Sequence, residues 1–255
     1  KKHDGERYTE FITKAAKGEV KINSSTLYPY DIVYEYLNKK SSMDLTLEAQ
    51  WNQLPNYCEN ADENFSGLVL CDTSGSMTSH KIDNKSSVRA LDVAISLALY
   101  LGERAKGVFQ NHFITFSATP VLQEIKGANV FEKVRNLSTA SWSMNTNFQA
   151  AFDLILNTAK RNNLSQADIP SMLLVISDME FDHCGSSTNF DTVKAKYQAA
   201  GYEMPKLVFW NVASRAQQIP VEKDQKDAYL VSGCSPAIFK SILGTKTVTP
   251  EDLML

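Results

Sequence analysis

The segment that most constrains the fold is residues 65–77, FSGLVLCDTSGSM, in which a short apolar run stops abruptly at an aspartate. A run such as 68–71, bounded by turn residues, is typical of a buried central strand in a parallel sheet. Three oxygen-bearing side chains then alternate, at Asp72, Ser74 and Ser76, and Gly75 allows a tight turn between them. Because ligands bind outside the carboxyl ends of the strands in doubly wound sheets, we expect these oxygens at the binding edge. Hard oxygen donors suit Mg²⁺, Mn²⁺ or Ca²⁺ and suit zinc poorly.

The rest of the chain alternates short apolar runs with amphipathic segments, which predicts an α/β fold with a mostly parallel, doubly wound sheet covered on both faces. Pro120 and a short run after it predict one antiparallel edge strand. Further strands are expected at 111–116, 121–125, 171–177, 206–211 and 228–232. Helices are expected at 88–106, 129–137, 148–161, 190–201, 235–243 and from 249 onward.

Residues 1–60 do not follow this alternation. Apolar side chains at helical spacing predict helices at 6–16, 30–37 and 45–54, with Pro29 at an early position of the second. We interpret these three helices as packing against the sheet domain, which gives two regions, a helical segment at 1–60 and an α/β domain at 61–255.

Asp72-Thr-Ser-Gly-Ser76 resembles the DxSxS signature of the von Willebrand factor A (vWA) domain. That family's metal-ion-dependent adhesion site adds a threonine from a second loop and an aspartate from a third. In this chain the matching residues are Thr146, within the segment SMNTNF, and Asp178, within VISDME. The resemblance implies a Rossmann-like domain that binds Mg²⁺, with Mn²⁺ or Ca²⁺ as alternatives, and captures an acidic side chain of a partner protein.

The flanking segments are similar to the vWA domain of TROVE/Ro-type RNA-binding proteins and to an uncharacterised relative of theirs from microbes and viruses. The resemblance implies that residues 1–60 are the end of a helical-repeat region. In TROVE proteins the helical part binds RNA, so the alternative function is an RNA-binding ribonucleoprotein component. One departure is Asn147, where TROVE-type domains often have aspartate.

Charge and composition narrow the classes of partner. Lys and Arg number 26 against 29 Asp and Glu, for a net charge of −3, so the chain lacks the basic excess of a nucleic-acid-binding domain. It has no apolar run of 18 residues, and we expect no membrane partner. The four cysteines match no zinc framework and predict reduced thiols of a cytoplasmic protein, with Cys71 pointing into the core.

Other interpretations of the same residues remain open. Ser74 and Ser76 could simply cap a helix, Asp178 could cap the following loop, and the site could shape loops without binding an ion. Trp142 and Met144 could contact a partner beside the ion or pack beneath their loop. A second metal site at 182–184 lacks further ligands at suitable spacing, and His3, His80 and His112 are expected at the surface or in the core.

Catalytic motifs are incomplete. A haloacid-dehalogenase phosphatase needs aspartate where Ser74 stands, a P-loop needs Gly-Lys-Ser/Thr, and neither Ser74 nor Ser76 lies in a G-x-S-x-G frame. We therefore expect a binding module rather than an enzyme.

Overall fold

The structure, a computed structural model, describes residues 4–24, 26–56, 66–72, 74–82, 86–105, 107–115, 119–139, 148–178, 190–213 and 228–234. The descriptions below refer to these residues.

Six strands form one sheet in the order β3-β2-β1-β4-β5-β6. The strands are β1 (Gly67–Cys71), β2 (His112–Thr115), β3 (Leu122–Glu124), β4 (Met172–Ser177), β5 (Lys206–Asn211) and β6 (Ala228–Ser232). All neighbours run parallel except β2 and β3, which are antiparallel. This strand order is that of a doubly wound sheet, in which the order reverses beside β1. The predicted fold class, including the antiparallel edge strand, is confirmed.

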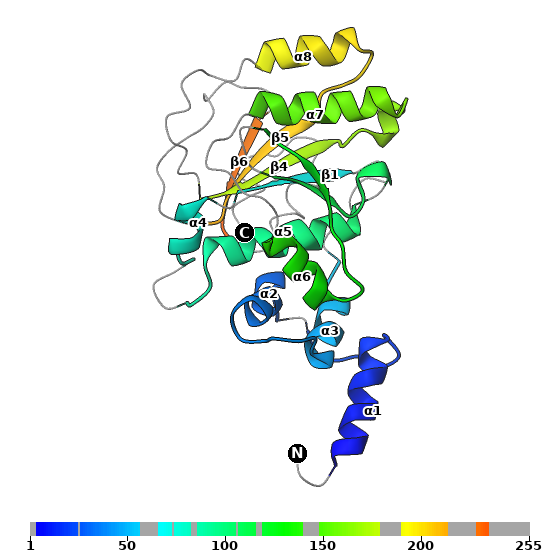
Figure 1. The fold of residues 1–255 in the computed structure, drawn as a ribbon, viewed down its shortest axis with the longest axis vertical. Helices are drawn as coiled ribbons and strands as arrows, with labels where there is room; N and C mark the ends of the chain where they lie inside the picture. Colours follow the sequence, from blue (N-terminus) through cyan, green and yellow to red (C-terminus); the bar gives the residue numbers. More distant parts are fainter. Residues whose placement is uncertain are drawn as a thin grey trace.

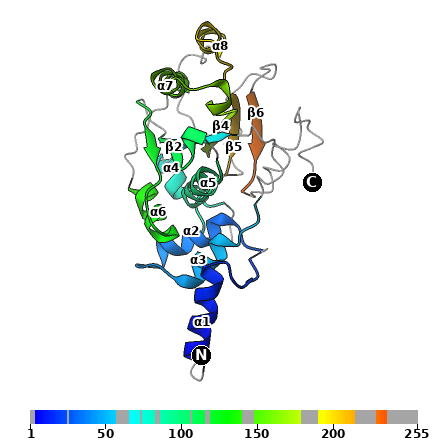
Figure 2. The same ribbon diagram turned by 90° about the vertical axis from the view of Figure 1, so that its right-hand side faces the viewer.

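Helices cover both faces of the sheet (Figure 1). They are α1 (Gly5–Ala16), α2 (Pro29–Asn38), α3 (Leu45–Asn52), α4 (Gly75–Ser79), α5 (Ala90–Arg104), α6 (Val130–Ser138), α7 (Phe148–Arg161) and α8 (Phe190–Ala199), with short 3₁₀ turns at Gly107–Phe109 and Gln166–Asp168. One face packs against α7 and α8 through a core that includes Leu70, Val175, Phe152 and Tyr197. The other face packs against α5, which Figure 2 shows end-on beneath the strands.

Helix α5 is covered on two sides. Its buried residues run almost continuously from Ala90 to Gly102, as expected for a helix enclosed by other elements. The sheet covers one side, and α2, α3 and α6 supply Tyr36, Trp51 and Val134 to the same core cluster. Helices α2 and α3 therefore pack against the sheet domain as predicted, whereas α1 extends away from the body and contacts α3 (Figure 1). Whether a domain boundary falls at residue 60 stays a prediction.

Local details agree with the expected helix starts. Pro29 occupies the first turn of α2, where its missing N–H costs nothing, and the Asn129 side chain caps α6 by accepting from Glu132 N. Helix α4 was not predicted, because its five residues carry no repeating apolar stripe. The helices expected at 235–243 and from 249 lie outside the described residues.

Cys71 is buried in the core as predicted, and in the described part of the chain Cys71 and Cys234 are thiols rather than disulfides. Among the described helices, none combines the length and apolar character needed to cross a membrane.

Candidate metal centre

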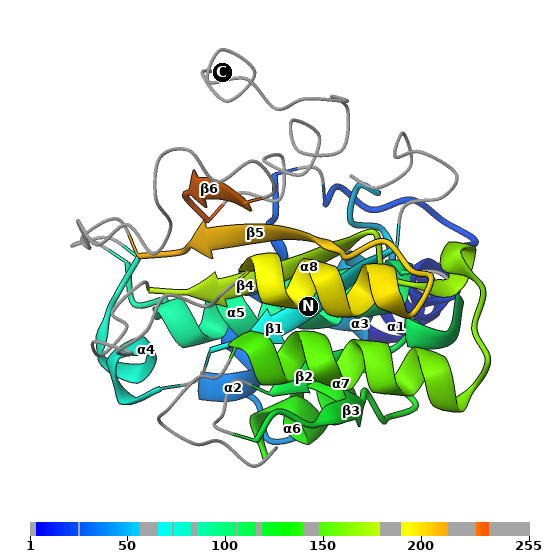
Figure 3. The same cartoon turned by 90° about the horizontal axis from the view of Figure 1, so that it is seen from above.

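Asp72 and Asp178 follow the carboxyl ends of two adjacent parallel strands, β1 and β4. Cys71 pairs with Ile176, and Asp72 N donates to Ile176 O at 2.9 Å, so Asp72 lies level with Ser177. Helix α4 lies beyond the arrowheads of β4 and β5 (Figure 3). Strands β1 and β4 and helix α4 thus meet at the binding edge of the sheet, where the sequence predicted a site.

The loop after β1 wraps around the Asp72 carboxylate. Ser74 N donates to Asp72 Oδ1 at 2.8 Å, and Ser177 Oγ donates to Asp72 Oδ2 at 2.6 Å. The hydroxyls of Ser74 and Ser76 are 3.0 Å apart. Two short segments of chain thus bring together four oxygen-bearing side chains, those of Asp72, Ser74, Ser76 and Ser177.

Both carboxylates are removed from water, since Asp72 and Asp178 are each about 1% exposed. Burial raises the pKa of Asp72, hydrogen bonds from Ser177 and Ser74 lower it, and the negative charge of Asp178 raises it further. Strand register brings the two residues to the same edge, because Asp72 lies level with Ser177, the residue before Asp178, and Ser177 Oγ bonds to Asp72. Two buried like charges at one edge are unfavourable unless a cation is shared between them.

His80 is a further member of the cluster that the sequence did not assign to it. It follows α4, and its Nδ1 lies 3.0 Å from Asp178 Oδ2. The side chain of His80 is 29% exposed, whereas that of Asp178 is fully buried. Its only sequence signal is the spacing of four residues from Ser76, which places both on one face of a helix turn.

Ser177 was also missed as a site residue. The signal was available, because pairing β1 with β4 through their apolar runs puts the residue after Cys71 level with the residue after Ile176. Residues that are in register on adjacent strands point to the same face of the sheet, which brings the Ser177 hydroxyl to Asp72.

We call Asp72, Ser74, Ser76, His80, Ser177 and Asp178 the strand-end cluster. Within the described residues no group of three or more His, Cys, Asp and Glu side chains is arranged to hold a metal ion. The cluster instead combines two carboxylates with hydroxyls, and this oxygen-rich set fits Mg²⁺, Mn²⁺ or Ca²⁺ better than zinc.

Thr146, the fifth predicted ligand, lies outside the described residues. The same is true of Trp142, Met144 and Asn147, of the segment 182–184, and of His3. The structure therefore brings Asp72, Ser74 and Ser76 together and sets Asp178 on the adjacent strand end, and the roles of all five as metal ligands stay predictions.

The strand order, with a cluster of polar side chains at the ends of β1 and β4, defines a doubly wound α/β module. The chain belongs to the family described as Domain of unknown function (DUF7788), whose sequence model matches residues 66–254. An uncharacterized protein of Acanthamoeba polyphaga mimivirus is 28% identical over 252 residues, which are 97% of this chain and 42% of the viral protein.

Two solved structures are similar to the fold. The RO (RSR) protein of Deinococcus radiodurans matches with a TM-score of 0.58 and 14% identity, over 94% of this chain and 49% of that chain. The SpRpn10 VWA domain matches with a TM-score of 0.41 and 11% identity, over 72% of this chain and 96% of that chain. The predicted similarity to Ro-type proteins is thus confirmed for the fold. The chain spans less than half the length of the viral relative and of the RO protein.

Proposed function

We propose that this chain is a metal-dependent protein-binding module, in which a divalent cation held at the strand-end cluster captures an acidic side chain of a partner. The observation that carries the proposal is that Asp72 and Asp178, each about 1% exposed, follow the ends of the adjacent parallel strands β1 and β4, beside the hydroxyls of Ser74, Ser76 and Ser177. The favoured ion is Mg²⁺, with Mn²⁺ and Ca²⁺ as chemically similar alternatives.

The cation follows from the cost of burying charge. Removing a carboxylate from water costs several kcal/mol even in a relaxed protein interior. One divalent ion would neutralise both Asp72 and Asp178 and leave the site near zero net charge. Ser74 and Ser76, which are half-buried, would supply neutral oxygens, and the resemblance adds Thr146 from its loop.

Capture of a partner follows from the coordination number. Mg²⁺ takes six oxygen ligands and keeps waters where the protein supplies fewer. A carboxylate from a partner can replace such a water, and the bound ion then contributes a positive charge at the contact. The role of this chain's own residues is to hold the ion and exclude bulk water from its inner side, and we propose no catalysis.

Calorimetry tests ion binding directly. Wild-type protein stripped with EDTA should release or absorb heat on titration with Mg²⁺ and with Mn²⁺, and Asp72→Ala and Asp178→Ala should give flat traces. The matched control is Asp168→Ala, because Asp168 lies before β4 on the opposite edge and bonds only locally to Ser165. A flat trace for the wild type with both ions would remove the proposal.

Partner capture needs a second measurement. A library of peptides carrying a single Glu or Asp should be enriched on immobilised wild-type protein in Mg²⁺ and released by EDTA. Enrichment that is equal in Mg²⁺ and EDTA would show that the ion is not part of the contact.

RNA binding is a second candidate, favoured by the RO-like fold over 94% of this chain and by the resemblance to TROVE proteins. Retention of structured RNA on filters at low salt, falling as salt rises, would support it, because phosphate contacts weaken with ionic strength. No retention at low salt would remove it.

A cytoplasmic location is likewise proposed from the predicted reduced cysteines.

A further inference from the structure

His80 joins two segments of the strand-end cluster that are far apart in the sequence. Its Nδ1 lies 3.0 Å from Asp178 Oδ2, so a residue at the end of α4 contacts a residue at the end of β4. The buried carboxylate is thereby held by a side chain that reaches it from the partly exposed side of the cluster.

The backbone of His80 is fixed on both sides. His80 N donates to Ser76 O at 2.9 Å, and Ala90 N donates to His80 O at 2.8 Å. Lys81 and Arg89 form an isolated antiparallel bridge immediately beyond. The backbone of His80 is therefore anchored to the turn that carries Ser76 and to the start of α5.

The direction of the hydrogen bond follows from the chemistry of the acceptor. A carboxylate that carries no proton only accepts hydrogen bonds, so a bond to such a carboxylate requires the hydrogen to lie on Nδ1 of the ring. A bond to a charged group is stronger than one between neutral groups. The Asp178 carboxylate is consequently restrained in its rotation about the Cβ–Cγ bond.

We propose that His80 is a positioning residue that orients the Asp178 carboxylate and ties the turn bearing Ser74 and Ser76 to the end of β4. This inference rests on the proposed function, and it gives that site a residue outside the five predicted ligands. The ligand oxygens of two loops are then held at one place, which reduces the conformational entropy lost when an ion binds. Groups that orient metal ligands in this way are typically worth 10-fold to 100-fold in metal affinity.

The experiment compares metal affinities of three variants with the wild type by calorimetry. His80→Phe keeps a ring but removes the donor, and it should weaken Mg²⁺ and Mn²⁺ by the same factor, about tenfold or more. His80→Gln restores an N–H donor and should recover most of the loss. Ser79→Ala is the matched control on α4, because the Ser79 hydroxyl bonds only to Ser76 O within the helix, and it should bind like the wild type.

Two outcomes would overturn the inference. Wild-type affinity in His80→Phe would show that the contact does not position Asp178. A loss confined to Mn²⁺ would show that the ring binds the ion itself, since imidazole favours Mn²⁺ over Mg²⁺ as a ligand. A wild type that binds neither ion would instead remove the proposed function, so the two failures are distinguishable.

Amide hydrogen exchange in EDTA gives a readout that needs no ion. His80→Phe should speed exchange at the His80 amide, which closes α4, and should do so more than Ser79→Ala. Unchanged exchange would show that the contact orders nothing and would overturn the inference whether or not the wild type binds metal.

Discussion

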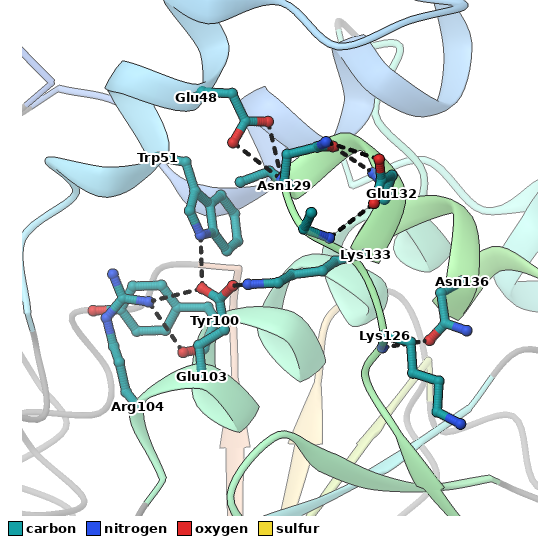
Figure 4. Close-up of polar contacts among 12 residues, drawn as sticks. Glu48, Trp51, Tyr100, Glu103, Arg104, Lys126, Asn129, Glu132, Lys133 and Asn136 are labelled. Atoms are coloured by element: carbon teal, nitrogen blue, oxygen red, sulfur yellow. Dashed lines mark hydrogen bonds and ion pairs between the residues drawn. The ribbon is translucent and has the colours of Figure 1, made fainter. Parts of the chain in front are cut away.

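Two of the regions in which this molecule removes carboxylates from water differ in what surrounds the charge. One region is the strand-end cluster. The other, which we call the helical seam, lies between α3 and the helices α5 and α6 and contains Glu48, Trp51, Glu103 and Lys133 (Figure 4).

At the seam the protein supplies N–H donors and a cation. Glu48, 8% exposed, accepts from Val130 N at 2.9 and 3.1 Å and from the Tyr36 hydroxyl at 3.0 Å. Glu103 accepts from Trp51 Nε1 and from Lys133 Nζ, each at 2.7 Å. Figure 4 shows Glu48 and Trp51 reaching from α3 to these partners. Glu48 also sits at the positive amino end of α6.

At the strand ends, Asp72 accepts from the Ser177 hydroxyl and the Ser74 amide, and the negative charge of Asp178 raises its pKa. Burial alone therefore does not distinguish a functional carboxylate from a structural one. A carboxylate supplied with internal positive charge holds the fold together, whereas one placed beside another carboxylate is suited to an external cation.

Deleting residues 1–56 should have the largest effect, because it removes the covering of α5 and the whole seam. The side chains lost from the core include Ile32, Val33, Tyr36, Trp51 and Leu54, at roughly 1.5–3 kcal/mol each, or on the order of 10 kcal/mol. That equals the typical stability of a domain, so the fragment should not fold stably.

Circular dichroism and thermal unfolding check this expectation. The control is deletion of residues 1–20, since among the described residues α1 packs in a small cluster of its own around Ile12, Ala15 and Ala49 and should be removable at lower cost. A stable 57–255 fragment would show instead that the two predicted regions fold independently.

Glu48→Ala should destabilise the protein by about 2–4 kcal/mol in chemical denaturation. It leaves Val130 N buried without its acceptor, at a cost of about 1–3 kcal/mol. It also leaves the Tyr36 hydroxyl with the longer bond to Asp44 O at 3.2 Å, and it removes the packing of the Glu48 side chain. Glu132→Ala is the matched control, because Glu132 also accepts near the start of α6, from Ala128 N, but is exposed. Equal losses in both variants would contradict the importance of burial at the seam.

Trp51→Phe should cost about 1–2 kcal/mol, since it removes the N–H donor to Glu103 while keeping an aromatic ring against Tyr100. Combining it with Glu103→Gln in a double-mutant cycle isolates the contact. A coupling energy near zero would mean that the loss comes from packing alone.

Sequence pattern predicted most of the fold because strands and helices here follow simple periodicities. The apolar runs of β1 and β4, the alternation of elements and the Pro29 start of α2 are all visible in the sequence. For the segment that forms α5, however, the helical spacing of Leu91, Ala94, Ile95, Ala98 and Leu101 predicts a single buried stripe, and this stripe is too narrow. Val93, Leu97, Leu99 and Tyr100 are apolar and buried outside that stripe, and they were the available signal that other helices cover its second side.

The candidate site was predicted only in part, for a physical reason. A motif identifies side chains that are close in sequence, such as Asp72, Ser74 and Ser76. Ser177 and His80 enter through strand register and through the turn of α4, and these are tertiary relations. Helix α4 is too short for periodicity to reveal, so the contact between His80 and Asp178 could not be predicted from the sequence.

Replacing aspartate by asparagine should change stability in opposite directions at two buried sites, Asp72 and Asp92. Burial and the charge of Asp178 raise the pKa of Asp72 above its ordinary value of 3.8, so the ionised carboxylate costs folding free energy at neutral pH. In EDTA, Asp72→Asn should therefore be as stable as the wild type or more stable, by up to about 1 kcal/mol, a typical single-site effect. The amide oxygen can still accept from Ser74 N, and the amide nitrogen can donate to Ser177 Oγ.

Asp92 is the matched control for that substitution. It is fully buried, and it accepts from Arg89 N at 2.8 Å and from the Arg89 guanidinium at 2.7 and 3.1 Å. Asp92→Asn weakens a paired buried charge and should destabilise the protein in EDTA and in Mg²⁺ alike. For Asp72→Asn, any advantage in EDTA should shrink as pH falls through the raised pKa of Asp72 toward 3.8, because the wild type then gains its own proton. Saturating Mg²⁺ should reverse that advantage, since an ion that binds only the wild type stabilises it by about 2.7 kcal/mol at 100 times the Kd. If both variants were destabilised in EDTA, the Asp72 carboxylate would stabilise the fold, as Glu48 and Glu103 of the helical seam do.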